Sequence, residues 1–172
     1  MLKIVGCSLI LIASGGIAYC IQKEMNHHMV LLYELRRLFL DISYEMQYAM
    51  MPMEYIFLQK IQCKEPVLEK ICREIGMLLG EKQEKDGGSI WSIVFEKYGK
   101  ELALKGEEFE VLKAAGNIFF GKSMEENKNS LSLFLERWND LIAVWQKERR
   151  EKQKVYQTVT VMCGLMIMIL LI

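Results

Sequence analysis

The sequence predicts an all-α protein, a bundle of about six helices flanked by a transmembrane helix at each end. Uncharged apolar runs occupy residues 4–22 and 155–172, and each approaches the roughly 20 residues that a helix needs to cross a bilayer. Between these runs, apolar residues recur at spacings of three and four, the period of one helix face. No segment alternates apolar and polar residues in the pattern of a half-buried strand.

Charge divides the chain into an N-terminal transmembrane helix (1–22), a helical domain (23–154) and a C-terminal transmembrane helix (155–172). The formal net charge is zero. Basic residues nevertheless gather just before the second run, at Lys147, Arg149, Arg150, Lys152 and Lys154. By the positive-inside rule, this cluster predicts a cytoplasmic middle domain. The cluster also suits contact with anionic lipid headgroups or, as the alternative, with a docked partner.

Residues 1–22 have a second interpretation, a cleaved signal peptide. Lys3 precedes the apolar stretch, and small residues such as Ala13 and Ala18 lie near a possible cleavage point, as signal peptides require. The basic segment ahead of the second run favours the retained anchor, and we adopt that interpretation.

Prolines mark the first elements of the middle domain. A helix is expected over residues 24–50, with one apolar face made of Leu31, Leu32, Leu35, Leu38, Phe39, Ile42, Met46 and Ala49. Pro52 restricts the residue before it and ends this helix, so residues 53–62 form a short separate helix. Pro66 suits the first position of a third helix, over residues 66–80.

Glycines and polar residues mark the remaining elements. Residues 81–88 form a polar, glycine-bearing loop, after which Ser89 is expected to cap the next helix. Gly99 and Gly106 bracket a turn, and a helix over 107–120 follows and ends at Gly121. From residue 123 onward, one long amphipathic helix leads to the second apolar run without a helix-breaking residue.

The sequence contains no catalytic, nucleotide-binding or metal-binding motif. His27 and His28 are adjacent, so they project about 100° apart on a helix and cannot share a metal ion. Cys63 and Cys72 are nine positions apart and belong to no Cys-x-x-Cys pair, so we expect reduced core residues rather than a disulfide or zinc site. We therefore predict no enzyme, no cofactor, no metal and no nucleic-acid partner.

Glu45 is the first candidate for binding a partner. It lies at the edge of the apolar stripe that contains Ile42 and Ala49. A carboxylate at such an edge either pairs within its own domain or meets the cation of a partner, because an unpaired charge is costly to bury. Both alternatives stay open. Tyr48 and Pro52, at the expected helix break, complete the candidate site.

Several short motifs occur in order along the chain. They are Met1-Leu2-Lys3-Ile4-Val5-Gly6 at the start, Glu45-Met46-Gln47-Tyr48 ahead of Pro52, Phe120-Gly121-Lys122-Ser123 after a helix, and Cys163-Gly164-Leu165 in the second run. Together with the two anchors, this ordered set resembles the stage III sporulation protein AB family of endospore-forming bacteria. The chain departs from the family pattern at Met51 and Met53, where Thr and Leu are usual.

The resemblance implies a component of the channel between mother cell and forespore. Its domain would be similar to the cytoplasmic domain of the inner-membrane platform proteins of type II secretion and type IV pilus systems. Its partners would be a stage III sporulation protein AA-type ATPase and other channel subunits, and its location the outer forespore membrane facing the mother cell. The residues alone leave an alternative, a membrane-anchored helical sensor that binds a small ligand in a polar-lined cavity.

Overall fold

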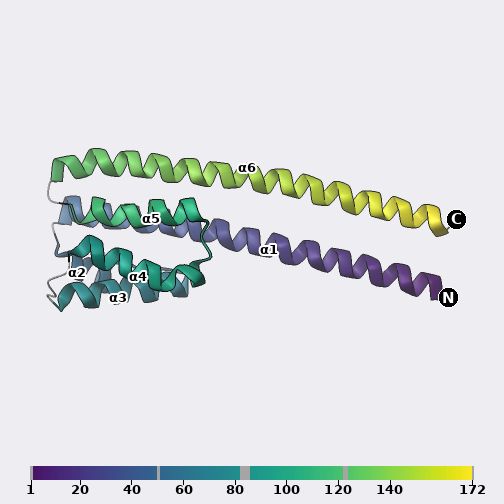
Figure 1. Ribbon diagram of the computed structural model, residues 1–172, viewed down its shortest axis with the longest axis horizontal. Coiled ribbons are helices and arrows are strands. Elements are labelled where there is room, and N and C mark those ends of the chain that lie inside the picture. Colours follow the sequence, from purple (N-terminus) through teal and green to yellow (C-terminus); the bar gives the residue numbers. More distant parts are fainter. Residues whose placement is uncertain (1, 50, 82–85, 122–123, 172) are drawn as a thin grey trace. The chain divides into compact units, whose positions relative to one another are not determined.

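The computed structural model describes residues 2–49, 51–81, 86–121 and 124–171, and this part of the chain contains helices and no strand. The α-helices in it are α1 (Leu2–Tyr44), α2 (Met53–Tyr55), α3 (Pro66–Gly80), α4 (Gly87–Leu102), α5 (Gly106–Phe119) and α6 (Met124–Leu171) (Figure 1). Two π-helical segments, η1 (Glu45–Ala49) and η2 (Ile56–Lys60), directly follow α1 and α2. The predicted all-α class is confirmed.

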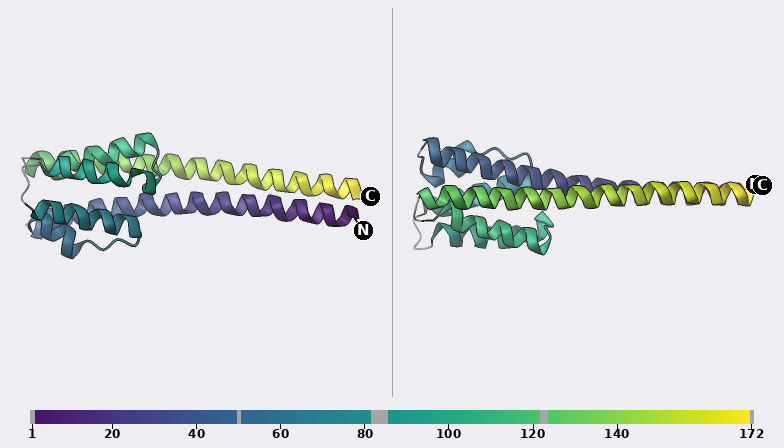
Figure 2. Two further views of the ribbon diagram at one scale, coloured as in Figure 1. Left: turned by 60° about the horizontal axis from the view of Figure 1, so that its bottom comes forward. Right: turned by 90° about the horizontal axis from the view of Figure 1, so that it is seen from above.

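The chain divides into two compact units. Unit 1 comprises Met1–Met29 and Ala143–Ile172, and unit 2 comprises Val30–Ile142. In unit 1, the first part of α1 and the last part of α6 run side by side (Figure 2). The rings of His28 and Trp145 are in contact there, with 4.1 Å between their centroids.

Both expected membrane spans are helical, since residues 4–22 belong to α1 and residues 155–171 belong to α6. In the part of the chain that is described, we find no helix with both the length and the apolarity needed to cross a membrane. Most side chains of the two expected spans lie outside that part, as does residue 172.

Aromatic side chains form the centre of unit 2. Phe39 of α1 meets Phe134 and Trp138 of α6 edge-on, with ring centroids 4.8 and 5.1 Å apart. The indole N–H of Trp138 donates to the carbonyl of Leu32 at 3.1 Å, and that of Trp91 donates to the carbonyl of Leu112 at 2.8 Å. Each indole N–H therefore has an acceptor, so neither of the two fully buried rings leaves a donor unsatisfied.

The predicted apolar faces point into this core. Fully buried side chains come from α1, α3, α4, α5 and α6, and include Leu32, Leu35, Ile42, Leu68, Ile71, Ile75, Phe95, Leu112 and Trp138. Each large apolar side chain removed from water stabilises the fold by about 1.5–3 kcal/mol. On the face predicted for residues 24–50, the apolar residues from Leu31 to Ile42 are buried and Met46 is half-buried, while the side chain of Ala49 lies outside the described part.

The predicted start of α4 is wrong. Ser89 is not its N-cap, because the helix already begins at Gly87 and the capping position belongs to Asp86, whose side chain makes no capping hydrogen bond. Gly88 is buried near Asn117 and the backbone of Gly116 in α5. Gly87 and Gly88, which were predicted to lie in the loop, are therefore helical because α4 packs closely against α5.

The turn predicted between Gly99 and Gly106 is present, but it is shorter than expected and covers residues 103–105. Gly99 lies inside α4, which continues to Leu102. A Cβ atom at Gly99 would stand 3.1 Å from the ring of Phe109 in α5, so the glycine serves close packing rather than a turn. The chain reverses after Leu102 instead, where Ala103 adopts a left-handed conformation with φ of 49°.

Candidate partner-binding site

The three residues predicted to bind a partner lie where α1 ends and α2 begins. Glu45 and Tyr48 belong to η1, and Pro52 is the N-cap of α2. The Pro52 carbonyl accepts the backbone N–H groups of Tyr55 and Ile56 at 3.0 and 3.1 Å. Tyr48 and Pro52 are exposed and Glu45 is half-buried, so all three are accessible on the surface of unit 2.

Tyr48 forms an exposed aromatic pair with Tyr44. Their ring centroids are 4.9 Å apart with an interplanar angle of 37°, and the residues are 73% and 61% exposed. Rings this exposed add little to the stability of their own domain. Tyrosines of this kind are enriched among the residues that dominate protein–protein binding, which makes the pair the apolar part of the site.

Asp41 precedes Tyr44 by three positions and Glu45 precedes Tyr48 by three, a spacing at which side chains on a helix are neighbours. Burial raises the pKa of Asp41, the charge of Arg37 opposes this, and the charges of Glu34 and Glu45 raise it further. Arg37 pairs with Asp41 at 3.6 Å, and both side chains are about half exposed. The charges that act on Asp41 are thus one cation, Arg37, and two further carboxylates, Glu34 and Glu45, so negative charge exceeds positive charge among these four residues.

Glu45 itself has no ion pair with any residue that the structure describes. The intradomain salt bridge that we considered as its alternative role is therefore not observed within residues 2–49, 51–81, 86–121 and 124–171. Arg37, about two helical turns before Glu45, is paired with Asp41 at 3.6 Å.

The backbone of the site is wound differently from α1. Residues 45–49 are π-helical, with hydrogen bonds that span five residues instead of four. This winding changes the direction of the side chains that follow, so their positions depart from the regular 3.6-residue face. Short π-helical segments occur frequently at functional sites, which agrees with the accessibility of Tyr48.

Sequence reasoning missed two parts of this site. Tyr44 lies off the apolar stripe and four positions before Tyr48, the spacing at which helical side chains meet, and this signal could have found it. Asp41 follows Arg37 by the same spacing. The raised pKa of Asp41, however, depends on its burial and on the charges of Glu34 and Glu45, which only the structure shows.

The predicted basic cluster lies on the α6 part of unit 1. Lys147, Arg150 and Lys154 are exposed at spacings of three and four, and Arg149 is half-buried. Lys152 pairs with Glu148 at 3.7 Å and lies 5.9 Å above the Trp145 ring. Exposed pairs of this kind contribute at most about 1 kcal/mol, so the cluster is mainly a solvated positive surface.

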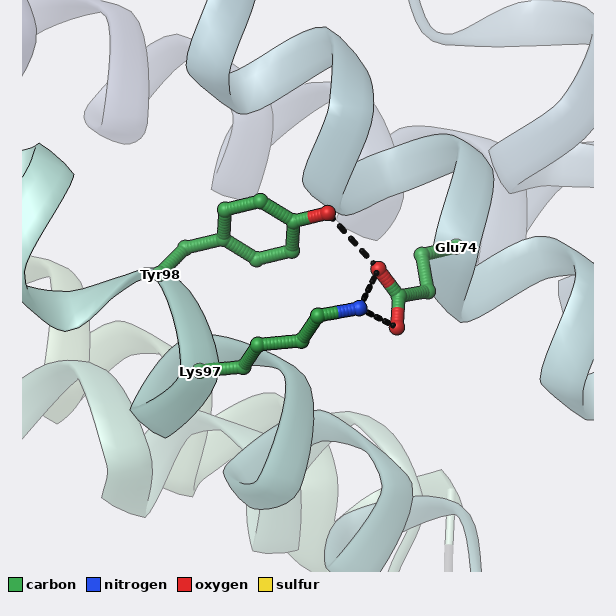
Figure 3. A network of polar contacts seen from close by, with 3 residues as sticks. All are labelled: Glu74, Lys97 and Tyr98. Atoms are coloured by element: carbon green, nitrogen blue, oxygen red, sulfur yellow. Dashed lines mark hydrogen bonds and ion pairs between the residues drawn. The ribbon is translucent and has the colours of Figure 1, made fainter.

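A polar cluster joins α3 to α4 in unit 2. The carboxylate of Glu74 accepts hydrogen bonds from the Lys97 ammonium at 2.7 and 2.9 Å and from the Tyr98 hydroxyl at 2.8 Å (Figure 3). The bond from Lys97 outweighs the effect of burial and, with that from Tyr98, lowers the pKa of Glu74. The bond to Glu74 in turn raises the pKa of Lys97 and of Tyr98. The cluster therefore holds two helices together.

Within the residues that the structure describes, no three His, Cys, Asp or Glu side chains lie close enough to hold a metal ion. His28 instead packs its ring on Trp145 in unit 1.

Comparison with known protein families gives a match over nearly the whole chain. The family model described as stage III sporulation protein AB (spore_III_AB) matches residues 3–172. Neither the comparison with curated proteins nor the comparison with solved structures gives a significant match.

Proposed function

The chain belongs to the stage III sporulation protein AB family, and from this premise we propose that it is a non-enzymatic, membrane-anchored scaffold of the sporulation channel between mother cell and forespore. Membership gives the protein a role in sporulation, and the family is not a known family of enzymes. In this proposal the scaffold links a secretion-type ATPase, of the stage III sporulation protein AA type, to the membrane subunits of the channel.

The observation that carries the proposal is the exposed Tyr44–Tyr48 pair beside the carboxylates of Asp41 and Glu45. The two rings are more than half exposed, and the carboxylates belong to a group of four charged residues in which negative charge exceeds positive charge. A partner with an apolar pocket and a basic residue at its rim fits this combination. We assign the ATPase to this surface.

Membrane attachment is the second part of the proposal. The uncharged runs 4–22 and 155–172 support anchors at both ends, in the outer forespore membrane with the domain facing the mother-cell cytoplasm. The basic cluster from Lys147 to Lys154 supports this orientation, since such clusters remain on the cytoplasmic side. Two anchors would hold the domain between the ATPase and the membrane subunits and pass the motion of one to the other.

A binding titration tests the proposed partner surface. The full-length chain in detergent is titrated with the purified ATPase, and the same is done with the variant Glu45→Arg. Reversing a charge inside an interface typically costs about 2 kcal/mol or more, so we expect binding to weaken at least about thirtyfold. Glu136→Arg, an equal charge reversal at an exposed position of α6, is the matched control and should bind as the unmodified chain does.

The controls separate a lost interface from a lost fold. Circular dichroism should give equal helix content for both variants, and Tyr48→Ala should weaken binding without reversing any charge. The assignment is contradicted if the folded full-length chain does not bind the ATPase, or if Glu136→Arg weakens binding as much as Glu45→Arg does.

A further inference from the structure

Two cysteines of unit 2 face each other across a loop. Cys63 lies between η2 and α3, and Cys72 lies within α3. Their Sγ atoms are 3.8 Å apart, about 1.8 Å more than the bond length of a disulfide. Cys72 is 3% exposed and Cys63 is half-buried, so an oxidant reaches one sulfur more easily than the other.

We propose that Cys63 and Cys72 form a reversible dithiol–disulfide site that is oxidised by low-molecular-weight disulfides such as oxidised glutathione. The site is independent of the function proposed above and rests only on the positions of the two sulfurs. Both cysteines are free thiols in the structure, as the sequence predicts, and the proposal adds a reaction that they can undergo.

The two thiols have different roles in the reaction. The hydrogen bond from Cys72 lowers the pKa of Cys63, while the same bond and burial raise the pKa of Cys72 well above its usual value. Cys63 is therefore the attacking thiolate, because the thiolate rather than the thiol is the nucleophile. It attacks oxidised glutathione, forms a mixed disulfide and releases one glutathione thiolate.

Cys72 then resolves the mixed disulfide. Once Cys63 carries glutathione, its negative charge is gone and no longer opposes ionisation of Cys72. The Cys72 thiolate attacks the Cys63 sulfur and releases the second glutathione as a thiolate. In sum, two cysteine thiols and one oxidised glutathione give one disulfide and two reduced glutathione molecules.

The bond would fix the loop before α3 to the helix itself. This region is already closely packed, because a Cβ atom at Gly76 of α3 would stand 2.7 Å from the Leu58 side chain of η2. The backbone N–H of Lys64, next to Cys63, also approaches the Glu34 carboxylate of α1 at 3.5 Å. Oxidation would therefore link the loop before α3 to α3 itself, and the packing of this region already holds the two sulfurs close together.

Peptide mapping tests the proposal on the full-length chain. The purified reduced protein is treated with oxidised glutathione, remaining thiols are blocked, and the chain is cut with trypsin. Cleavage after basic residues separates residues 61–64 from residues 71–73. We expect these two peptides joined, with the mass of their sum less two hydrogens, and formed at least about tenfold faster in the native chain than in urea, because the fold holds the sulfurs together.

The variants give opposite expectations for the two cysteines. Cys72→Ser should leave Cys63 as a stable mixed disulfide with glutathione, and Cys63→Ser should leave Cys72 unmodified. Mixed-disulfide formation at Cys63 in the Cys72→Ser variant shows that the reagent reaches the site. The proposal is overturned if Cys63 reacts in that variant while 61–64 and 71–73 stay separate in the unmodified chain, if Cys63 links two chains instead, or if native and denatured chains react at equal rates.

Discussion

Replacing Gly116 by alanine should destabilise unit 2, although the same change in most helices is stabilising. Gly116 is buried in α5 against the indole of Trp91 in α4. A Cβ atom there would stand 2.7, 2.8 and 3.0 Å from three carbons of Trp91, against an ordinary contact distance of 3.4–4 Å. Helix α5 would have to move away from α4, or the indole would have to turn.

The indole has little freedom to turn. Trp91 is 0% exposed, its N–H is bonded to the Leu112 carbonyl, and its ring contacts Phe95 with 4.6 Å between centroids. Overpacking of a rigid core costs about 1–3 kcal/mol, and in helices alanine gains up to about 1 kcal/mol over glycine. We expect Gly116→Ala to lower the free energy of unfolding by about 1–2 kcal/mol.

Urea unfolding followed by circular dichroism measures this change. Gly106→Ala is the matched control, because nothing lies within 4 Å of a Cβ at that helical position, and it should be neutral or stabilising by up to about 1 kcal/mol. A urea midpoint that rises as much for Gly116→Ala as for Gly106→Ala would show that the alanine side chain does not clash with Trp91.

Two further predictions concern polar contacts of unit 2. Glu74→Gln should destabilise the fold most at neutral pH. Because the pKa of Glu74 is lowered in the fold, its stabilisation is present above the ordinary carboxyl pKa of 4.5 and is lost as the pH falls through the folded pKa. A destabilisation that does not change with pH in urea titrations would contradict this role. Trp138→Phe removes the donor to the Leu32 carbonyl from a fully buried site and should lower the free energy of unfolding by about 1–3 kcal/mol; an unchanged midpoint would show that this bond contributes nothing.

The helical core could be predicted because the residues that recur with the helical period are the residues that are buried. Leu35, Phe39 and Ile42 recur at helical spacing and are all fully buried. The glycines of α4 could not be interpreted in this way. Gly99 is inside a helix because Phe109 packs on it, and this tertiary contact outweighs the low helix propensity of glycine. Sequence spacing contains no information about which side chain of another helix lies opposite.

The candidate site was predictable only in outline. Glu45 and Pro52 were recognised from the edge of the apolar stripe and from the helix break. The π-helical winding of residues 45–49 follows no periodic pattern in the sequence, and it determines how Tyr48 meets Tyr44. The approach of Cys63 to Cys72 likewise depends on how the loop before α3 folds back on the helix, which their separation along the chain does not reveal.

Photo-crosslinking in sporulating cells tests most directly whether the Tyr44–Tyr48 surface binds the ATPase. A photoreactive phenylalanine analogue replaces Tyr48 in one strain and Leu133, an exposed residue of α6 that is 66% accessible, in a second strain. We predict that irradiation links the secretion-type ATPase to the chain from position 48 and not from position 133. A crosslink to the ATPase from position 133 alone, or its absence from position 48 in cells that make both proteins, would contradict the account.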